Sequence, residues 1–164
     1  MATGNMDLSG IEASFLGFNL NGNLQARNFQ SASGTMSGRL TLNGRNNLRE
    51  VLNAIDQRDL ADVVQSMNLE IVVDGSRSNL AINPLNLDVV LSGSRIPNSP
   101  VTVALNSNSV LNLENDSLNT SAFTLSGLGL DLRGSMLINN LQGDTSYSGQ
   151  VNLPRINLRR LMQQ

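Results

Sequence analysis

The sequence predicts a mainly β protein, an antiparallel sheet of about ten short strands with two or three short amphipathic helices. Apolar side chains alternate with polar ones over most of its 164 residues, as in Leu85, Leu87 and Val89 with Asn86 and Asp88 between them. This period of two is typical of strands with one apolar and one polar face. Clusters of Asn, Asp, Gly and Ser separate these runs by hairpin-sized links, which predicts that neighbouring strands are antiparallel.

The first strands are expected between residues 6 and 42. Leu16, Phe18 and Leu20 alternate with polar residues or glycine, and Gly22 permits a bend or a bulge. Residues 31–34 are small and polar, which predicts a turn before the alternation resumes.

The period changes to that of a helix in three places. Residues 48–55 carry apolar side chains at i, i+3, i+4 and i+7, and Asn47 can cap them. Asp59 can cap a second helix, predicted over residues 60–67, and a third helix is expected to begin at Asn157.

Strands are predicted again from Asn68 to a last strand at residues 147–153. We expect separate strands before and after Pro84, and we expect Gly127-x-Gly129 to lie inside a strand rather than to cradle a phosphate. The remaining breaks are predicted turns or loops at residues 74–75, 97–100, 114–116 and 143–144.

Part of the sequence occurs twice. Leu16–Gly22 matches Leu128–Gly134 at an offset of 112 residues, and the offset falls to 110 where Asn47-Leu48-Arg49 recurs as Asn157-Leu158-Arg159. Such a repeat predicts structural units that stack in series. We therefore expect residues 1–57 to form the end of one unit with its cap helix, residues 58–67 a connecting helix, and residues 68–164 a second unit of the same continuous sheet.

The composition excludes several classes of function. The chain has no His and no Cys, so Ser-His-Asp and Cys-His catalytic sites and the usual zinc sites are impossible. The net charge of −2 argues against nucleic-acid binding, which needs a basic patch. Glu114 and Asp116 are explained by a turn, because their spacing is not that of a calcium-binding loop. We expect no enzyme activity, no cofactor and no metal.

The repeated ending of the two units resembles that of the AsmA family of large bacterial envelope proteins. In both copies a strand that begins with Gly is followed by a turn and an Asn-Leu-Arg helix start, at residues 38–52 and 149–162. The family carries an apolar residue before Asn-Leu-Arg. Ile156 fits this pattern, and Asn46 departs from it. The resemblance covers essentially the whole chain through short motifs that occur twice in the same order.

The resemblance implies more than the residues themselves. AsmA-like proteins are similar to bridge-like lipid transfer proteins: they are anchored in the inner membrane of Gram-negative bacteria and extend into the periplasm. Their repeated sheets curl into a long, taco-like groove thought to carry phospholipid towards the outer membrane. We therefore expect this chain to be a piece of a longer protein that takes part in outer-membrane biogenesis, with phospholipid as its partner.

The alternation gives candidate residues for the apolar face that would contact lipid. Two interpretations of this face stay open, an open groove or a core covered by the helices at 48–55 and 60–67. The candidates are Leu16, Phe18, Leu20, Leu85, Leu87, Val89, Val101, Val103, Leu128, Leu130 and Leu132.

Other functions remain as alternatives. A non-enzymatic assembly scaffold would use the edges of the sheet to pair with other β-proteins, and these edges would also favour pairing with neighbouring repeats or self-association. A β-solenoid adhesin ranks last, because solenoid coils repeat every 20–30 residues or so and the repeat here is far longer.

Overall fold

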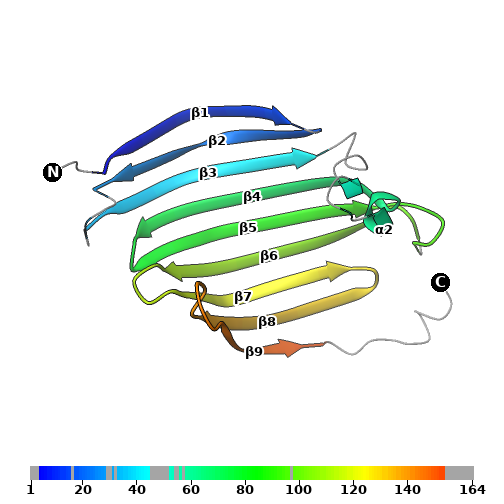
Figure 1. The fold of residues 1–164 in the computed structure, drawn as a ribbon. Coiled ribbons are helices and arrows are strands. Elements are labelled where there is room, and N and C mark those ends of the chain that lie inside the picture. Colours follow the sequence, from blue (N-terminus) through cyan, green and yellow to red (C-terminus); the bar gives the residue numbers. More distant parts are fainter. Residues whose placement is uncertain are drawn as a thin grey trace.

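The structure, a computed structural model, describes residues 4–153 except 16, 29, 30, 32, 45–51, 54, 55, 57 and 97. It is one antiparallel sheet in which every strand pairs with its neighbours in the sequence (Figure 1). The prediction of a mainly β, antiparallel protein is confirmed. The strands are β1 (Met6–Phe15), β2 (Phe18–Arg27), β3 (Thr35–Gly44), β4 (Val64–Ser76), β5 (Asn79–Leu91), β6 (Val101–Asn112), β7 (Ser117–Gly127), β8 (Leu130–Asn139) and β9 (Ser146–Asn152).

The described strands number nine rather than the expected ten, and they are longer than predicted. The prediction of separate strands around Pro84 is wrong, because β5 runs through this residue. Between Ile82 and Leu85 the pairing with β4 shifts, so that two residues of β5 stand opposite one residue of β4. A bulge of this kind accommodates a proline, which cannot donate a hydrogen bond to the ladder.

Two turns also differ from the prediction. The prediction of a turn at residues 74–75 is wrong, since β4 continues to Ser76 and the chain turns at residues 77–78. Gly127-x-Gly129 is not inside a strand: β7 ends at Gly127, and residues 127, 128 and 129 all have positive φ. Glycine tolerates this backbone conformation, which suits a tight turn between β7 and β8.

The helical part of the described chain is small. Helix α2 spans Arg58–Ala61, so the predicted helix over residues 60–67 is wrong beyond Ala61. The chain enters β4 at Val64, and Met67 pairs with Gly44 on one side and Val89 on the other. Strand pairing on both sides outweighs a local helical spacing. Of the helix expected at 48–55, residues 52 and 53 are helical and the others lie outside the described residues, as does the helix expected from Asn157.

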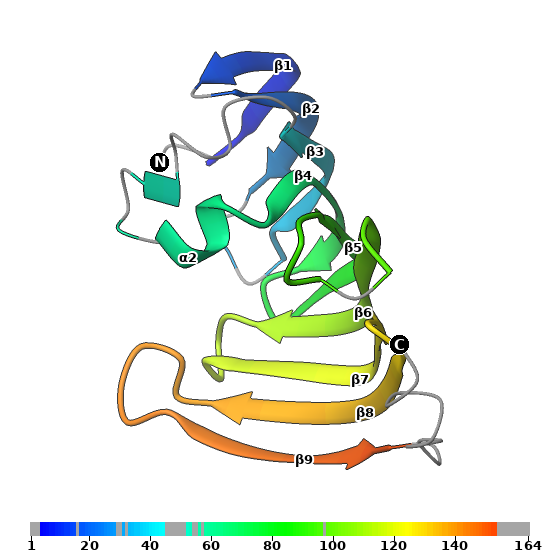
Figure 2. The same cartoon turned by 90° about the vertical axis from the view of Figure 1, so that its right-hand side faces the viewer.

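The sheet is curved rather than flat. In the side view of Figure 2, the strands from β1 to β9 curl around the side on which α2 lies. Ala61 of α2 is buried, and the backbone N–H of Ser92 donates to the carbonyl of Val63 just after the helix. Helix α2 and the link that follows β5 therefore stand together at one end of the concave side.

The internal repeat is present in the strand pairing. In β1 and β2, Met6 pairs with Ala26 and Leu8 with Leu24. The register then shifts, and Ile11 pairs with Gly22. Adding 112 to each number gives the pairing of β7 and β8, including the shift between Thr120 and Phe123.

The hairpin links and the third strand repeat as well. Asn28 and Asn140 both have positive φ, and each accepts a hydrogen bond on its carbonyl from the residue three positions later. With offsets of 112 for β2 and 111 for β3, the pairs that join β2 to β3 become those that join β8 to β9. Leu24 with Gly38, for example, becomes Met136 with Gly149. Strands β7, β8 and β9 therefore repeat β1, β2 and β3.

Candidate functional site

The strands separate apolar from polar side chains almost completely. Directly paired residues share a face of the sheet, and successive residues alternate between the two faces. One side, the apolar face, carries no charged side chain from any described strand. Besides the row described next, its apolar side chains include Met6, Leu8, Ile11, Phe15, Phe18, Leu24, Leu40, Ile71, Val73, Leu80, Ile82, Leu85, Val89, Val101, Val103, Leu111, Leu118, Phe123, Leu130, Met136, Ile138, Tyr147 and Val151.

An unbroken aliphatic row crosses the apolar face from β1 to β8. We call it the leucine row. Each member pairs directly with the next across neighbouring strands, which lie about 4.8 Å apart, so the row is about 34 Å long. It consists of Ala13, Leu20, Leu42, Leu69, Leu87, Leu105, Leu125 and Leu132.

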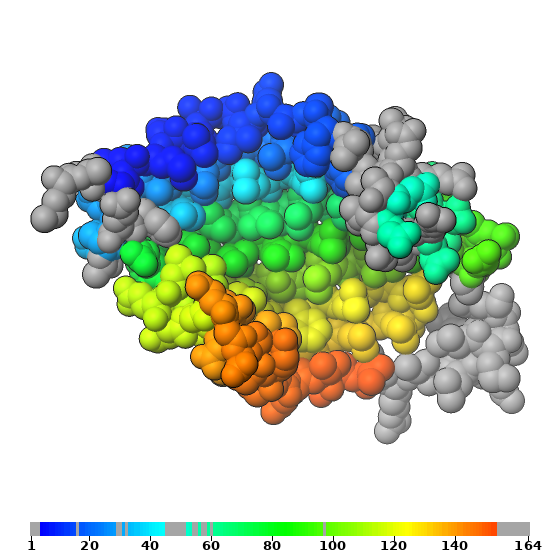
Figure 3. Space-filling model, viewed as in Figure 1, coloured from blue at the N-terminus to red at the C-terminus, as the bar shows by residue number. Residues whose placement is uncertain are grey.

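The apolar face is open over most of its area. Among the described residues, only four apolar side chains are buried, Phe18, Ala26, Ala61 and Leu80. All extensive contacts between described elements join adjacent strands, so no second layer of described elements covers this face. In the space-filling view, α2 stands over the right-hand end and leaves much of the sheet to its left in view (Figure 3).

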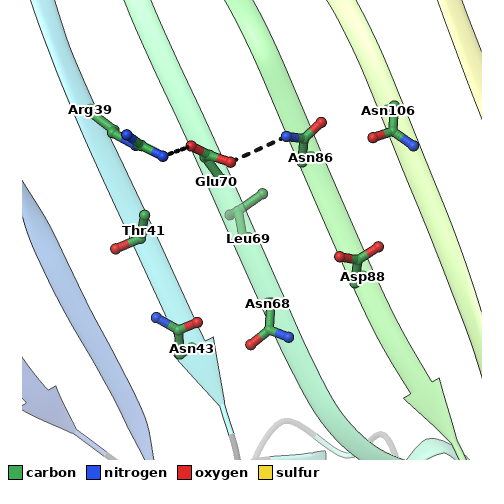
Figure 4. Close-up of a pocket in the computed structure, with 9 residues that line it drawn as sticks. All are labelled: Arg39, Thr41, Asn43, Asn68, Leu69, Glu70, Asn86, Asp88 and Asn106. Atoms are coloured by element: carbon green, nitrogen blue, oxygen red, sulfur yellow. Dashed lines mark hydrogen bonds and ion pairs between the residues drawn. The ribbon is translucent and has the colours of Figure 1, made fainter.

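Figure 4 shows the opposite, polar face. The strand order and the directions of β3 and β5 in Figure 4 are mirrored relative to Figure 1. Figure 4 therefore shows the sheet from the opposite side. The apolar face is therefore the concave one that curls around α2. On the polar face Glu70 forms an ion pair with Arg39 and accepts a hydrogen bond from Asn86 (Nδ2 to Oε2, 3.2 Å). These residues line a shallow hollow of about 340 Å³ together with Thr41, Asn43, Asn68, Asp88, Asn106 and Leu69. The strand pairing of Leu69 places its side chain on the apolar face.

Among the paired residues of the described strands, three Ser and Thr side chains interrupt the apolar face: Ser107, which pairs with Leu85 and Phe123, and the pair of Ser109 and Thr120. Ser109 on β6 and Thr120 on β7 are paired, and their hydroxyl oxygens are 2.9 Å apart. Both residues are buried, and one hydroxyl donates to the other, so each oxygen has a hydrogen-bond partner inside the protein. The pair lies two rows away from the leucine row, which is aliphatic throughout.

The structure brings most of the predicted site residues together. Phe18, Leu20, Leu85, Leu87, Val89, Val101, Val103, Leu130 and Leu132 lie on the apolar face. Leu128 does not: it lies in the turn between β7 and β8 with a φ of +52°. Leu16 lies outside the described residues.

Sequence reasoning missed five of the eight members of the leucine row: Ala13, Leu42, Leu69, Leu105 and Leu125. Leu42, Leu69, Leu105 and Leu125 were recognised as strand residues but were not among the candidates for the site. The signal that could have identified them is the register between strands, since each pairs directly with a neighbouring member of the row. Alternation within one strand carries no information about that register.

Other kinds of site find no support among the described residues. They contain no group of three or more His, Cys, Asp or Glu side chains that could hold a metal ion. In the same part of the chain no helix is both long enough and apolar enough to cross a membrane. No protein-family model, curated protein or solved structure matches this chain.

Proposed function

We propose that this chain is a non-enzymatic, periplasmic module of an AsmA-like protein anchored in the inner membrane of a Gram-negative bacterium. Its role is to shield the acyl chains of phospholipid on the apolar face during transport between the inner and outer membranes. The observation that carries the proposal is the open, concave apolar face with its uninterrupted leucine row.

The energetics of lipid transfer explain why such a face is useful. Each methylene group moved from water to an apolar surface contributes about 0.8 kcal/mol. Two acyl chains of about 16 carbons therefore encounter a barrier on the order of 20 kcal/mol in water. A concave aliphatic surface lowers this barrier without any catalytic group, which fits the absence of His and Cys.

The direction of the leucine row favours the sliding of an acyl chain along the sheet over its binding at one fixed place. The row runs across the strands, so an acyl chain lying along it meets a leucine every 4.8 Å or so. Sliding by one strand replaces one leucine contact by another, with little change in buried area. Its length, about 34 Å, is close to the roughly 30 Å hydrocarbon thickness of a bilayer.

The test is co-purification with lipid. The chain would be produced in a bacterial periplasm, analysed by native mass spectrometry and extracted for phospholipid. Leu125→Asp places a charge in the leucine row, and Thr124→Asp places the same charge on the neighbouring residue of β7, which faces the polar side.

We expect phospholipid with the native chain and with Thr124→Asp, and a loss of lipid with Leu125→Asp. Circular dichroism of all three proteins shows whether each is folded. A native chain that is folded and free of lipid under these conditions, or equal lipid on both folded variants, would contradict the proposal.

A structural scaffold for outer-membrane biogenesis is the second candidate. It is favoured by the exposed edge strands, where Tyr147 and Val151 on β9 are 71% and 59% exposed. A scaffold would bind other β-proteins through these edges and keep its apolar face free of lipid. The lipid content measured above therefore distinguishes the two functions.

A further inference from the structure

We infer that the outer edge of β9 is a docking site for one kind of strand: an antiparallel strand with the residue pattern of β4, bound in the register in which β4 binds β3. This inference rests on the repeated strand pairing, and it holds whether or not the apolar face carries lipid.

Strand β9 stands where β3 stands in the other copy of the repeat. Met36, Gly38 and Leu40 correspond to Tyr147, Gly149 and Val151 at an offset of 111. The surroundings of the two glycines also correspond. A Cβ atom on Gly38 would meet the Asn23 carbonyl and Leu24, and one on Gly149 would meet the Ser135 carbonyl and Met136. Ser135 and Met136 are the counterparts of Asn23 and Leu24 at an offset of 112.

The two strands differ on their outer side. Strand β3 pairs with β4, and Met36, Gly38 and Leu40 are half-buried. Every residue of β9 is exposed, and no described strand pairs with its outer edge. An exposed edge with free backbone N–H and C=O groups accepts a further strand. The missing neighbour of β9 is therefore the counterpart of β4.

The β3–β4 pairing specifies what this strand looks like. It places Gly75, Val73 and Ile71 opposite Met36, Gly38 and Leu40. A strand bound to β9 would place a small residue opposite Tyr147 and branched aliphatic residues opposite Gly149 and Val151. In β4, Glu70 forms an ion pair with Arg39 of β3. In β9 the position of Arg39 is occupied by Gln150, so the bound strand needs no acidic residue at the position of Glu70.

The edge of β1 is expected to pair with a different kind of strand. Strand β1 corresponds to β7, whose other neighbour is β6. The β1 edge is therefore matched to a β6-like strand, and a β4-like strand discriminates between the two edges of the sheet.

The test uses a synthetic peptide with the sequence of Val64–Ser76 and the intact chain, which contains no cysteine. Ser148 corresponds to Ser37, which pairs with Asp74. The chain carrying Ser148→Cys is mixed under oxidising conditions with the peptide carrying Cys in place of Asp74. The control peptide carries Cys in place of Glu70, about 13 Å further along the strand, beyond the roughly 7 Å Cα separation that a disulfide spans.

We expect a one-to-one disulfide adduct with the first peptide. The control peptide should form no more adduct than a cysteine-containing peptide of scrambled sequence. A chain with Asp7→Cys, on β1, should form no adduct with either. Hydrogen exchange of the chain with the cysteine-free peptide should slow in β9 only. Equal adducts with both peptides, equal reaction at β1, or no adduct and no protection of β9 would overturn the inference.

Discussion

The aromatic ring of Phe123 lies over Gly134, its direct partner across β7 and β8. A Cβ atom on Gly134 would be 2.8 Å from Cε1 and Cζ of that ring and would also clash with the carbonyl oxygen of Gln150 on β9. On β3, Leu40 fills the space beside Gly22 in the same way, with its Cδ2 atom 2.7 Å from the place of a Cβ. In both places a large side chain packs against a glycine of the neighbouring strand and occupies the space that a Cβ atom would need.

This packing predicts that Gly134→Ala destabilises the protein. The added methyl group must displace both the ring of Phe123 and the backbone of β9, and overpacking of this kind costs about 1–3 kcal/mol. The free energy of unfolding from urea titration measures the loss. Gly143→Ala is the matched control, since a Cβ there would meet nothing within 4 Å. Equal stability of the two variants would contradict the packing described for Gly134.

The openness of the apolar face predicts unequal costs for two leucines of β5. Leu80 is 5% exposed, so Leu80→Ala in lipid-free protein should cost about 3 kcal/mol, as for a buried leucine. Leu87, in the leucine row, is only half-buried, and Leu87→Ala should cost about 1 kcal/mol because less apolar area is lost and no closed cavity forms. Urea unfolding of both variants measures the difference. A loss at Leu87 as large as that at Leu80 would indicate a covered core.

The buried hydroxyl pair predicts a non-additive result. Thr120→Val leaves the hydroxyl of Ser109 buried without its partner, which should cost about 1–2 kcal/mol. The double variant Ser109→Ala with Thr120→Val removes both groups and should lose less stability than the sum of the single variants. A double-mutant cycle of unfolding free energies measures this coupling, and strictly additive losses would mean that the hydroxyls do not depend on each other.

The ion pair of Arg39 and Glu70 should contribute little to stability. Its side chains are 64% and 27% exposed, and exposed ion pairs contribute about 1 kcal/mol or less. We expect Arg39→Ala to lower the unfolding free energy within that limit, and less in 1 M salt than in 0.1 M salt, since salt screens the pair. Thermal or urea unfolding at both salt concentrations provides the measurement. A large, salt-independent loss would point to a different role for Arg39.

The sequence predicted the faces of the strands better than their ends. Leu85, Leu87 and Val89 lie on one face, as expected, because alternation of side chains follows directly from strand geometry. Pro84 was taken as a break because proline removes a ladder hydrogen bond, but a bulge absorbs it. Leu128 continued the period-two spacing of Leu130 and Leu132, yet the glycines on both sides of it favour a turn.

The predicted site was incomplete for a related reason. Residues 63, 64 and 67 have a helical spacing, and only the strands on either side decide that β4 begins at Val64. The leucine row depends on seven registers between eight strands, and no single strand encodes them. The internal repeat was visible in the sequence because its offset is nearly constant, and it extends to the pairing of the strands.

We propose that an acyl chain lies along the leucine row, and photocrosslinking of a bound lipid would show its position. A phospholipid with a photoreactive group at the end of one acyl chain would be mixed with the lipid-free chain and irradiated, and the modified residues would be mapped by mass spectrometry. We expect modification centred on Leu69, Leu87 and Leu105 of the apolar face and none on Asn68, Asn86 or Asn106 of the polar face. Modification confined to the polar face or the edge strands, or none at all, would contradict the proposal.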